Sequence, residues 1–270
     1  MSEDPEPARN ISGGQDGGGA VTRFEAGTPE TRAEAVVDRL GERYWQKSYG
    51  GQHAFVSLVR TILSQNTSDQ ASQPAHDSLM ERYGANGDLA AALAAASRDE
   101  LASTIESAGL YNQKSAVIQR TAQHVIDAYG SADAFDEYVR NEDALEVRDT
   151  LLQLKGVGPK TADCVLLFAG GREGVFPVDT HVHRIYRRIG IASPDADHEA
   201  VRAVLEDQVP PEKCGFGHTT SIQFGREYCT ARKPACLDGA EACPLFDLCD
   251  RVGVDLEAGT VVDPADAAES

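Results

Sequence analysis

Apolar residues recur at three- and four-residue spacing along most of the chain, which is the spacing of one face of a helix. This pattern predicts helices over residues 29–47, 53–64, 69–83, 98–107, 113–129, 145–154, 160–169, 180–190, 197–207 and 217–228. Glycine or proline interrupts most of the gaps between them, and no clear alternating pattern of a strand is present. The sequence therefore predicts an all-helical protein of about ten short helices.

The two ends of the chain lack this pattern. Residues 1–28 are rich in glycine, glutamate, aspartate and proline, which predicts disorder. Thr28 and Pro29 suit the capped start of the first helix. The segment 250–270 is acidic and alanine-rich, which predicts a solvated tail. The chain has neither an apolar run of about 20 residues nor a signal peptide, so we expect a cytoplasmic protein.

The net charge of −18 is unusual for a protein that binds nucleic acid, because such binding usually needs a basic surface. One interpretation is a different kind of partner. The other is adaptation to concentrated intracellular salt, as in haloarchaea, where a Debye length of about 3 Å at 1 M leaves only local charge effective. Residues 151–190 carry six positive and three negative side chains, so this segment is positive within an acidic chain.

Four of the six cysteines gather near the C-terminus, at Cys229, Cys236, Cys243 and Cys249. In an intracellular protein such a group indicates metal binding rather than disulfides. Paired C-x-x-C ligands, which many zinc sites use, are absent, although a zinc site and free core cysteines are the alternatives. The other two cysteines, Cys164 and Cys214, are predicted to be buried thiols.

The segment 151–162, Leu-Leu-Gln-Leu-Lys-Gly-Val-Gly-Pro-Lys-Thr-Ala, predicts two helices joined by a tight turn. Gly156 and Gly158 permit unusual backbone angles in the turn. Pro159 suits the first turn of the second helix, and Val157 is expected to point into the core. The amides bared at the turn and at the new helix can hold a phosphate oxygen. An ordinary connection between two helices is the alternative.

Two polar residues near this turn have the chemistry of a covalent catalyst. Lys160 lies in the first turn of the second helix, whose positive end disfavours an ammonium and so favours the neutral amine that attacks carbon. Asp179, 19 residues later, opens another helix. It suits an N-cap, and a carboxylate fixed there can also stabilise a developing cation or accept a proton. A solvated lysine and a plain N-cap are the alternatives.

Together these residues make the chain resemble the endonuclease III family of the helix-hairpin-helix DNA glycosylase superfamily. The main motifs are Leu-Lys-Gly-Val-Gly-Pro-Lys-Thr-Ala at 154–162 and Val-Asp-Thr-His-Val at 178–182. Two further stretches match, Leu-Ser-Gln-Asn-Thr-Ser-Asp at 63–69 and Gly-Leu-Tyr-Asn-Gln-Lys at 109–114. The resemblance covers residues 35–250, and the joint pattern is far more specific than any single motif.

The resemblance implies an all-α helix-hairpin-helix glycosylase fold, with two helical lobes and a cleft for DNA and the active site. The helical glycosylase domain is expected over 29–228, with the hairpin near 148–170, and a cysteine loop over 229–249. The expected partner is double-stranded DNA that contains damaged bases or abasic sites. We expect the protein to bind it as a monomer.

The resemblance also implies a role for each matching residue. Lys160 attacks the sugar C1′ of a nucleotide flipped out of the duplex, a step that costs a few kcal/mol, and forms a Schiff base before β-elimination; Asp179 assists. Either Gln65 or Asn66 fills the gap left by the flipped base, and Leu110 wedges into the opposite strand. Further DNA contacts are expected from Gly156, Gly158, His181 and Arg184.

In the family, four cysteines separated by six, two and five residues hold a [4Fe–4S] cluster. Here the intervals are six, six and five, so four extra residues lie within 237–242. A surface bulge would leave the sulfurs in place, since small loop insertions cost little. The resemblance thus implies a [4Fe–4S] cluster on Cys229, Cys236, Cys243 and Cys249.

Retention of Lys160 favours a glycosylase with lyase activity on oxidised pyrimidines. Adenine-specific relatives replace this lysine with a small residue and carry a glutamate before the gap-filling segment, where residues 57–63 of this chain have none. Thymine-mismatch relatives usually carry tyrosine at the position of the lysine. The alternatives are a mismatch glycosylase without lyase activity and a non-catalytic helix-hairpin-helix DNA-binding module.

Overall fold

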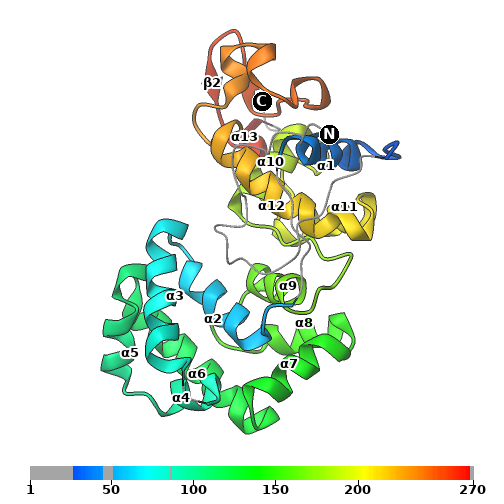
Figure 1. The fold of residues 1–270 in the computed structure, drawn as a ribbon. Coiled ribbons are helices and arrows are strands. Elements are labelled where there is room, and N and C mark those ends of the chain that lie inside the picture. Colours follow the sequence, from blue (N-terminus) through cyan, green and yellow to red (C-terminus); the bar gives the residue numbers. More distant parts are fainter. Residues whose placement is uncertain (1–26, 45–50, 86, 268–270) are drawn as a thin grey trace, which may run out of the picture. The chain divides into compact units, whose positions relative to one another are not determined.

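The computed structural model describes residues 27–44, 51–85 and 87–267, and nearly all of their regular secondary structure is helical (Figure 1). The predicted all-α class is confirmed. The chain divides into two compact units. We call Tyr49–Arg172 the central unit, and Met1–Ser48 with Glu173–Ser270 the terminal unit.

The central unit is built around α2 (Ala54–Ser64). This helix is apolar on most of its faces, as expected of a helix buried inside a domain, and Phe55, Leu58 and Ile62 have no exposed surface. Helices from later in the unit pack around it. The other elements are α3 (Asp69–Tyr83), α4 (Leu89–Ala95), α5 (Arg98–Thr104), η1 (Glu106–Ala108), α6 (Tyr111–Tyr129), α7 (Ala132–Asn141), α8 (Ala144–Leu152) and α9 (Pro159–Phe168).

The terminal unit packs α12 (Pro211–Glu227) against α1 (Arg32–Arg43) and α10 (Thr180–Ile189). Lys213 at the start of α12 contacts the buried carboxylates of Glu34 at 2.6 Å and Asp38 at 2.7 Å on α1. This ion cluster joins two segments that are far apart in the sequence. The unit also contains α11 (His198–Gln208), η2 (Ala235–Asp238), η3 (Ala240–Ala242), η4 (Phe246–Leu248), β1 (Val254–Asp255), β2 (Thr260–Val261) and α13 (Pro264–Ala267).

Several helix boundaries differ from the sequence prediction. The first helix begins at Arg32 rather than Pro29, because the Thr31 hydroxyl caps it by accepting from the Glu34 amide at 3.0 Å. The last long helix begins at Pro211, six residues earlier than predicted. The predicted set lacks α4 and α7. Helix α4 is short and alanine-rich, which gives a weak apolar stripe, whereas α7 buries Ala132, Phe135 and Val139 at helical spacing, a signal that the sequence did offer.

The acidic segment after the last cysteine is folded, so the predicted solvated tail is wrong for the described part of it. Strands β1 and β2 pair antiparallel, with Val254 opposite Val261. The amides of residues 250 and 252 donate to the last carbonyls of α10, and Asp263 pairs with Arg187 at 2.5 Å. Composition could not indicate this fold, because the partners of these residues lie on α10, more than 60 residues earlier in the chain.

Two sequence predictions concern the N-terminal extension and membrane-spanning segments. The predicted disordered extension 1–28 lies, up to residue 26, outside the described residues. In the described part of the chain, no helix is both long enough and apolar enough to cross a membrane.

The excess of acidic side chains predicts a fold that requires concentrated salt. In dilute buffer the carboxylates repel one another without screening, so we expect the melting temperature to fall by about 10 °C or more between roughly 2 M and 0.05 M KCl. Circular dichroism melts across this range check the prediction. Sucrose, which stabilises without screening charge, is the control. A melting temperature independent of KCl would refute the salt adaptation.

Candidate functional site

Helices α8 and α9 form the hairpin that the sequence predicts. Arg148 on α8 donates from Nε to Oδ1 of Asp163 on α9 at 2.7 Å, and both side chains are almost fully buried. Val157 in the turn is also buried, as predicted. An ion pair buried this deeply is costly to break, by about 3–5 kcal/mol if one partner is removed. The two helices therefore hold the turn in a fixed shape.

The two glycines of the turn serve different purposes. Gly156 has a φ of +101°, and a Cβ there would lie 2.7 Å from Cγ2 of Val117. Gly158 caps α9 with an ordinary φ of −101°, and no atom lies within 4 Å of where its Cβ would be. The expectation of unusual angles is therefore right for Gly156 and wrong for Gly158. At Gly158 the absent side chain leaves the amides at the start of α9 accessible.

This difference predicts that alanine substitutions at the two glycines affect different properties, stability at Gly156 and DNA affinity at Gly158. Gly156→Ala forces a strained φ and a clash with Val117, which should lower stability by about 2–4 kcal/mol. Gly158→Ala should change stability by under about 1 kcal/mol but weaken binding to undamaged duplex about tenfold, because the methyl group occupies the approach of a phosphate. Thermal melts and fluorescence anisotropy measure the two effects. Wild-type affinity in Gly158→Ala would place the phosphate elsewhere.

The segment after α2 orients its two amide residues differently. Gln65 Nε2 donates to the Gly156 carbonyl at 3.1 Å and to Oγ1 of Thr161 at 3.0 Å, so this amide ties the segment to the hairpin. Asn66 is exposed and has a φ of +51°, a left-handed conformation that asparagine adopts more readily than most residues. Asn66 therefore forms the tip of the segment and Gln65 its anchor.

A second tip lies between η1 and α6. Gly109 and Leu110 both have positive φ values, +63° and +48°, and Leu110 adopts the left-handed helical conformation. Leu110 is 51% exposed. A leucine with a strained backbone and an apolar side chain in water is unfavourable on both counts. Such a residue is suited to insert into an apolar partner, as the resemblance implies.

Lys160 is the second residue of α9 and is half-buried. It directly follows Pro159, so the hairpin turn fixes the start of the helix that carries it. The hairpin, the tip at Asn66, the tip at Leu110 and Lys160 all belong to the central unit. One folded body thus carries the proposed nucleophile, the hairpin turn and both exposed tips.

Asp179 belongs to the terminal unit and is the N-cap of α10, as predicted. Its Oδ1 accepts from the amides of His181 at 2.9 Å and Val182 at 2.8 Å. The residue is half-buried. These two bonds fix the orientation of the carboxylate, as a residue that acts on a transition state requires.

His181 and Arg184, one turn apart on α10, make contacts within the terminal unit. Arg184 donates from NH2 to the Cys229 carbonyl at 2.8 Å and lies 3.2 Å from Nδ1 of His181. Burial lowers the pKa of His181. The two side chains therefore support the base of the cysteine loop, and their contact with DNA stays a prediction.

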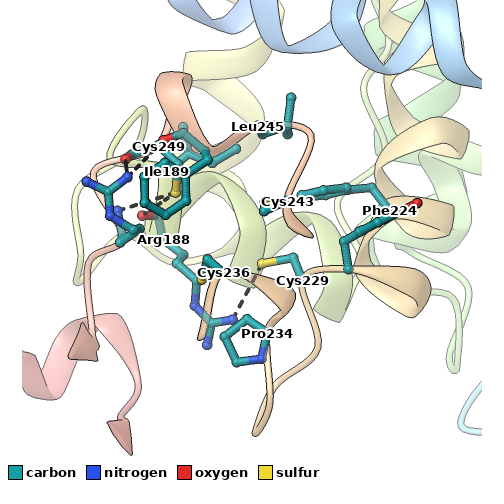
Figure 2. Close-up of a pocket in the computed structure, with 12 residues that line it drawn as sticks. Arg188, Ile189, Phe224, Cys229, Pro234, Cys236, Cys243, Leu245 and Cys249 are labelled. Carbon is teal, nitrogen blue, oxygen red and sulfur yellow. Dashed lines mark hydrogen bonds between the residues drawn. The ribbon is translucent and has the colours of Figure 1, made fainter. Parts of the chain in front are cut away.

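The four C-terminal cysteines surround one pocket (Figure 2). Cys229 follows α12, and the 3-10 turns η2, η3 and η4 bring round the other three, Cys236, Cys243 and Cys249. The extra residues 238–241 are exposed, so they form the predicted surface bulge. In the described residues no set of three or more His, Cys, Asp or Glu side chains closes around a single metal ion. The thiols instead line a wider space.

The surroundings of this pocket suit a negatively charged metal cluster. Arg188, which is buried, donates from NH1 to the Cys229 sulfur at 3.4 Å, and the Arg251 amide donates to the Cys249 sulfur at 3.3 Å. Donors of this kind stabilise ligating thiolates. Burial raises the pKa of Cys243 to about 11 and of Cys249 to about 12, so metal binding must displace their protons. The residues fit an iron–sulfur cluster.

Sequence reasoning did not identify Arg188 or Arg251 as part of this site. One signal was available for Arg188: it follows Ile185 by three residues on the apolar stripe of α10. A charged residue on such a stripe needs a buried partner. Arg251 gave no comparable signal.

Comparisons with known proteins agree with this geometry. The family model described as HhH-GPD superfamily base excision DNA repair protein matches residues 59–211, and the iron-sulfur binding domain of endonuclease III matches 229–249. Endonuclease III of Thermotoga maritima is 33% identical over 199 residues, which cover 73% of this chain and 82% of that protein. Endonuclease III of Bacillus subtilis is 32% identical over 219 residues, 80% of this chain and 90% of that protein.

Solved structures give the same result. A trapped endonuclease III–DNA covalent intermediate, in an estranged-adenine complex, has a TM-score of 0.67 and 28% sequence identity. The match covers 82% of this chain and 96% of that chain. The fold, the hairpin and the cysteine loop are thus shared along most of the sequence. The chain belongs to the endonuclease III family of HhH-GPD base excision DNA repair glycosylases, whose C-terminal domain binds a [4Fe–4S] cluster.

Proposed function

We propose that this DNA glycosylase also cleaves abasic sites, through a Schiff base on Lys160, and that its substrates are oxidised pyrimidines in duplex DNA. The observation that carries the proposal is the position of Lys160. It stands at the start of α9, directly after the hairpin turn and in the same unit as the two exposed tips. A relative of known structure has been trapped as a covalent intermediate with DNA, which supports an amine nucleophile.

In the proposed reaction, Nζ of Lys160 attacks C1′ and the bond from C1′ to the base breaks. The base leaves with a proton, and the sugar ring opens to give an imine between Lys160 and C1′. Loss of a proton from C2′ then breaks the C3′–O bond, which cuts the strand on the 3′ side. Water finally hydrolyses the imine and restores the lysine. The first step, attack on C1′, needs an uncharged amine.

Asp179 stabilises the positive charge that develops on the sugar as the base departs. Because two backbone amides hold its Oδ1, the carboxylate needs little reorganisation during the reaction. Lys160 and Asp179 come from different units of the chain.

Among the residues near the flipped base, we assign the gap-filling role to Asn66 and the wedge to Leu110. The Gln65 amide is occupied by Gly156 and Thr161, whereas Asn66 is exposed at the tip. The amide of Asn66 can hydrogen-bond the base left without a partner. Leu110 exposes apolar surface that stacking between bases would bury.

The [4Fe–4S] cluster is proposed to bind Cys229, Cys236, Cys243 and Cys249. When bound, it supplies a cross-link among four positions of a loop that has few buried residues of its own. That cross-link also fixes the exposed side chains of Arg232 and Lys233, which lie between the first two ligands. Two positive charges held there suit contact with the phosphate backbone.

Incubation with a panel of duplexes in the presence of borohydride tests the proposal. The panel carries an abasic site, thymine glycol, uracil or a mismatched thymine. We expect a covalent protein–DNA adduct and strand cleavage with the abasic site and with thymine glycol. Base release from the mismatch without any adduct would instead support a mismatch glycosylase. Binding without base release or cleavage on any duplex would support a non-catalytic module.

A further inference from the structure

Lys114 on α6 is a buried lysine with three hydrogen bonds, and no catalytic step uses it. Only 4% of the residue is exposed. Its Nζ donates to the Leu63 carbonyl at 2.7 Å, to Oγ1 of Thr67 at 2.8 Å and to the Ala108 carbonyl at 2.9 Å. All three protons of the ammonium thus have an acceptor. Burial lowers the pKa of Lys114, so keeping a charge here has a cost.

The three acceptors lie on the two segments that carry the exposed tips. Leu63 lies in the last turn of α2, Thr67 directly follows Asn66, and Ala108 comes two residues before Leu110. Thr67 adds a direct bond, since its hydroxyl donates to the same Ala108 carbonyl at 2.5 Å. The two tips are therefore joined through one ammonium and one hydroxyl.

The same segment is also fixed from its other side. Gln65 bonds to the hairpin at Gly156 and Thr161, so residues 64–67 are held between the hairpin and the second tip. Loops with positive φ values are otherwise easily displaced, because such backbone conformations persist only where surrounding contacts enforce them. The Lys114 ammonium supplies those contacts through groups beside the tip residues, and its backbone amide donates to the Leu110 carbonyl at 2.9 Å.

We propose that Lys114 is a positioning residue that holds the Asn66 tip and the Leu110 tip at a fixed separation, so that the two enter duplex DNA as one rigid body. The inference rests on the proposed function for the roles of the two tips. Preorganisation of this kind matters only where bases must be unstacked and a gap filled. An abasic site in single-stranded DNA needs neither, and its cleavage uses Lys160 without the help of either tip.

Lys114→Met tests this, because methionine keeps the length and apolar stem of the side chain and removes the charge and the donors. We expect kcat/KM on a duplex with thymine glycol to fall about 10²-fold, the loss typical of a displacement near 1 Å. Cleavage of an abasic site in a single strand should stay within about twofold of wild type. Thr67→Val, which removes one acceptor and the bond to Ala108, should give a smaller loss with the same selectivity.

Gln119→Met is the matched control. Gln119 lies on the same helix, and its Nε2 donates to the Ala96 carbonyl at 2.8 Å, in the loop between α4 and α5. The substitution removes a side-chain hydrogen bond from α6 to a backbone carbonyl, as Lys114→Met does, but the carbonyl belongs to a loop that carries neither tip. Activity on both substrates should remain near wild type.

The expected selectivity separates positioning from general support of the fold. Equal losses on duplex and single strand in Lys114→Met and Thr67→Val would overturn the proposal in favour of a purely structural role. Wild-type activity of both variants on the duplex would also overturn it, as would a duplex-selective loss in Gln119→Met. If Lys114→Met does not fold, Thr67→Val decides. Failure of the wild-type protein to form any adduct would instead refute the proposed function.

Discussion

Replacing Lys160 with glutamine should abolish the borohydride-trapped adduct and lower strand cleavage at an abasic site by roughly 10⁴-fold or more. Glutamine is a good helix former and resembles lysine in its apolar stem, so α9 and the hairpin should remain intact. It lacks the amine that attacks C1′. Denaturing gels of the reaction with and without borohydride measure both effects.

Lys155→Gln is the control for this substitution. Lys155 lies five residues earlier, in the exposed part of the hairpin turn, so its loss removes the same charge near DNA. The control should still form the adduct, with affinity for duplex lowered by one phosphate contact. An adduct formed by Lys160→Gln at the wild-type rate would show that another amine is the nucleophile.

A companion substitution, Asp179→Asn, removes the negative charge of the side chain but keeps its role as the N-cap of α10. Asparagine retains an Oδ1 that accepts from the amides of His181 and Val182 and is an equally good N-cap. The start of α10 and the affinity for DNA should therefore persist, while the chemical step slows by about 10²–10⁴-fold. Single-turnover rates on a bound duplex provide the measurement.

Replacing Cys243 with serine should have the second large effect, on the cysteine loop. Loss of one proposed ligand removes the cross-link that holds 229–249 together. A group that binds only the folded state at 1,000 times its dissociation constant contributes about 4 kcal/mol, so the melting temperature should fall by roughly 8–16 °C. Iron content should fall from about four per chain, and binding to duplex should weaken because Arg232 and Lys233 lose their support.

Cys164→Ser is the matched control, since Cys164 is a fully buried thiol on α9 that belongs to the other unit. It should keep its iron and lose only the stability that a buried hydroxyl costs, about 1–3 kcal/mol. Iron assays and thermal melts on both variants, purified without oxygen, decide the outcome. Full iron occupancy in Cys243→Ser would remove Cys243 from the ligand set.

The residues that could be predicted from the sequence are those whose role depends on neighbours in the chain. The turn at 155–158, the N-cap at Asp179 and the buried Val157 follow from glycine, proline and capping preferences that act within a few residues. The all-helical class follows from apolar spacing for the same reason. The structure confirms these features. They could be predicted because none of them depends on a contact with a distant part of the chain.

Features that depend on distant contacts were not predicted. Gln65 is the anchor and Asn66 the exposed tip because Gln65 bonds to Gly156 and Thr161, about 90 residues away along the chain. The folded C-terminal segment depends on the carbonyls that end α10. Gly158 was expected to need unusual angles because it follows Gly156 closely, yet its φ is ordinary. A local pattern does not show which of two nearby glycines bears the strain.

Lys114 illustrates the same limit most clearly. Its position in the motif at 109–114 gave no hint that its side chain points away from solvent, since lysine is rarely buried. Its burial and its three acceptors are properties of the packing of α2, α6 and η1. The polar residue that joins the two tips thus became visible only in the folded chain.

The most direct test of the central claim is identification of the amino acid that carries the trapped sugar. The wild-type protein is treated with an abasic duplex and borohydride, digested with nuclease and protease, and sequenced by mass spectrometry. The account predicts one modified peptide from residues 156–172, with the reduced sugar on Lys160. Modification of a different lysine or of the N-terminal amine, with an unmodified Lys160, would contradict it.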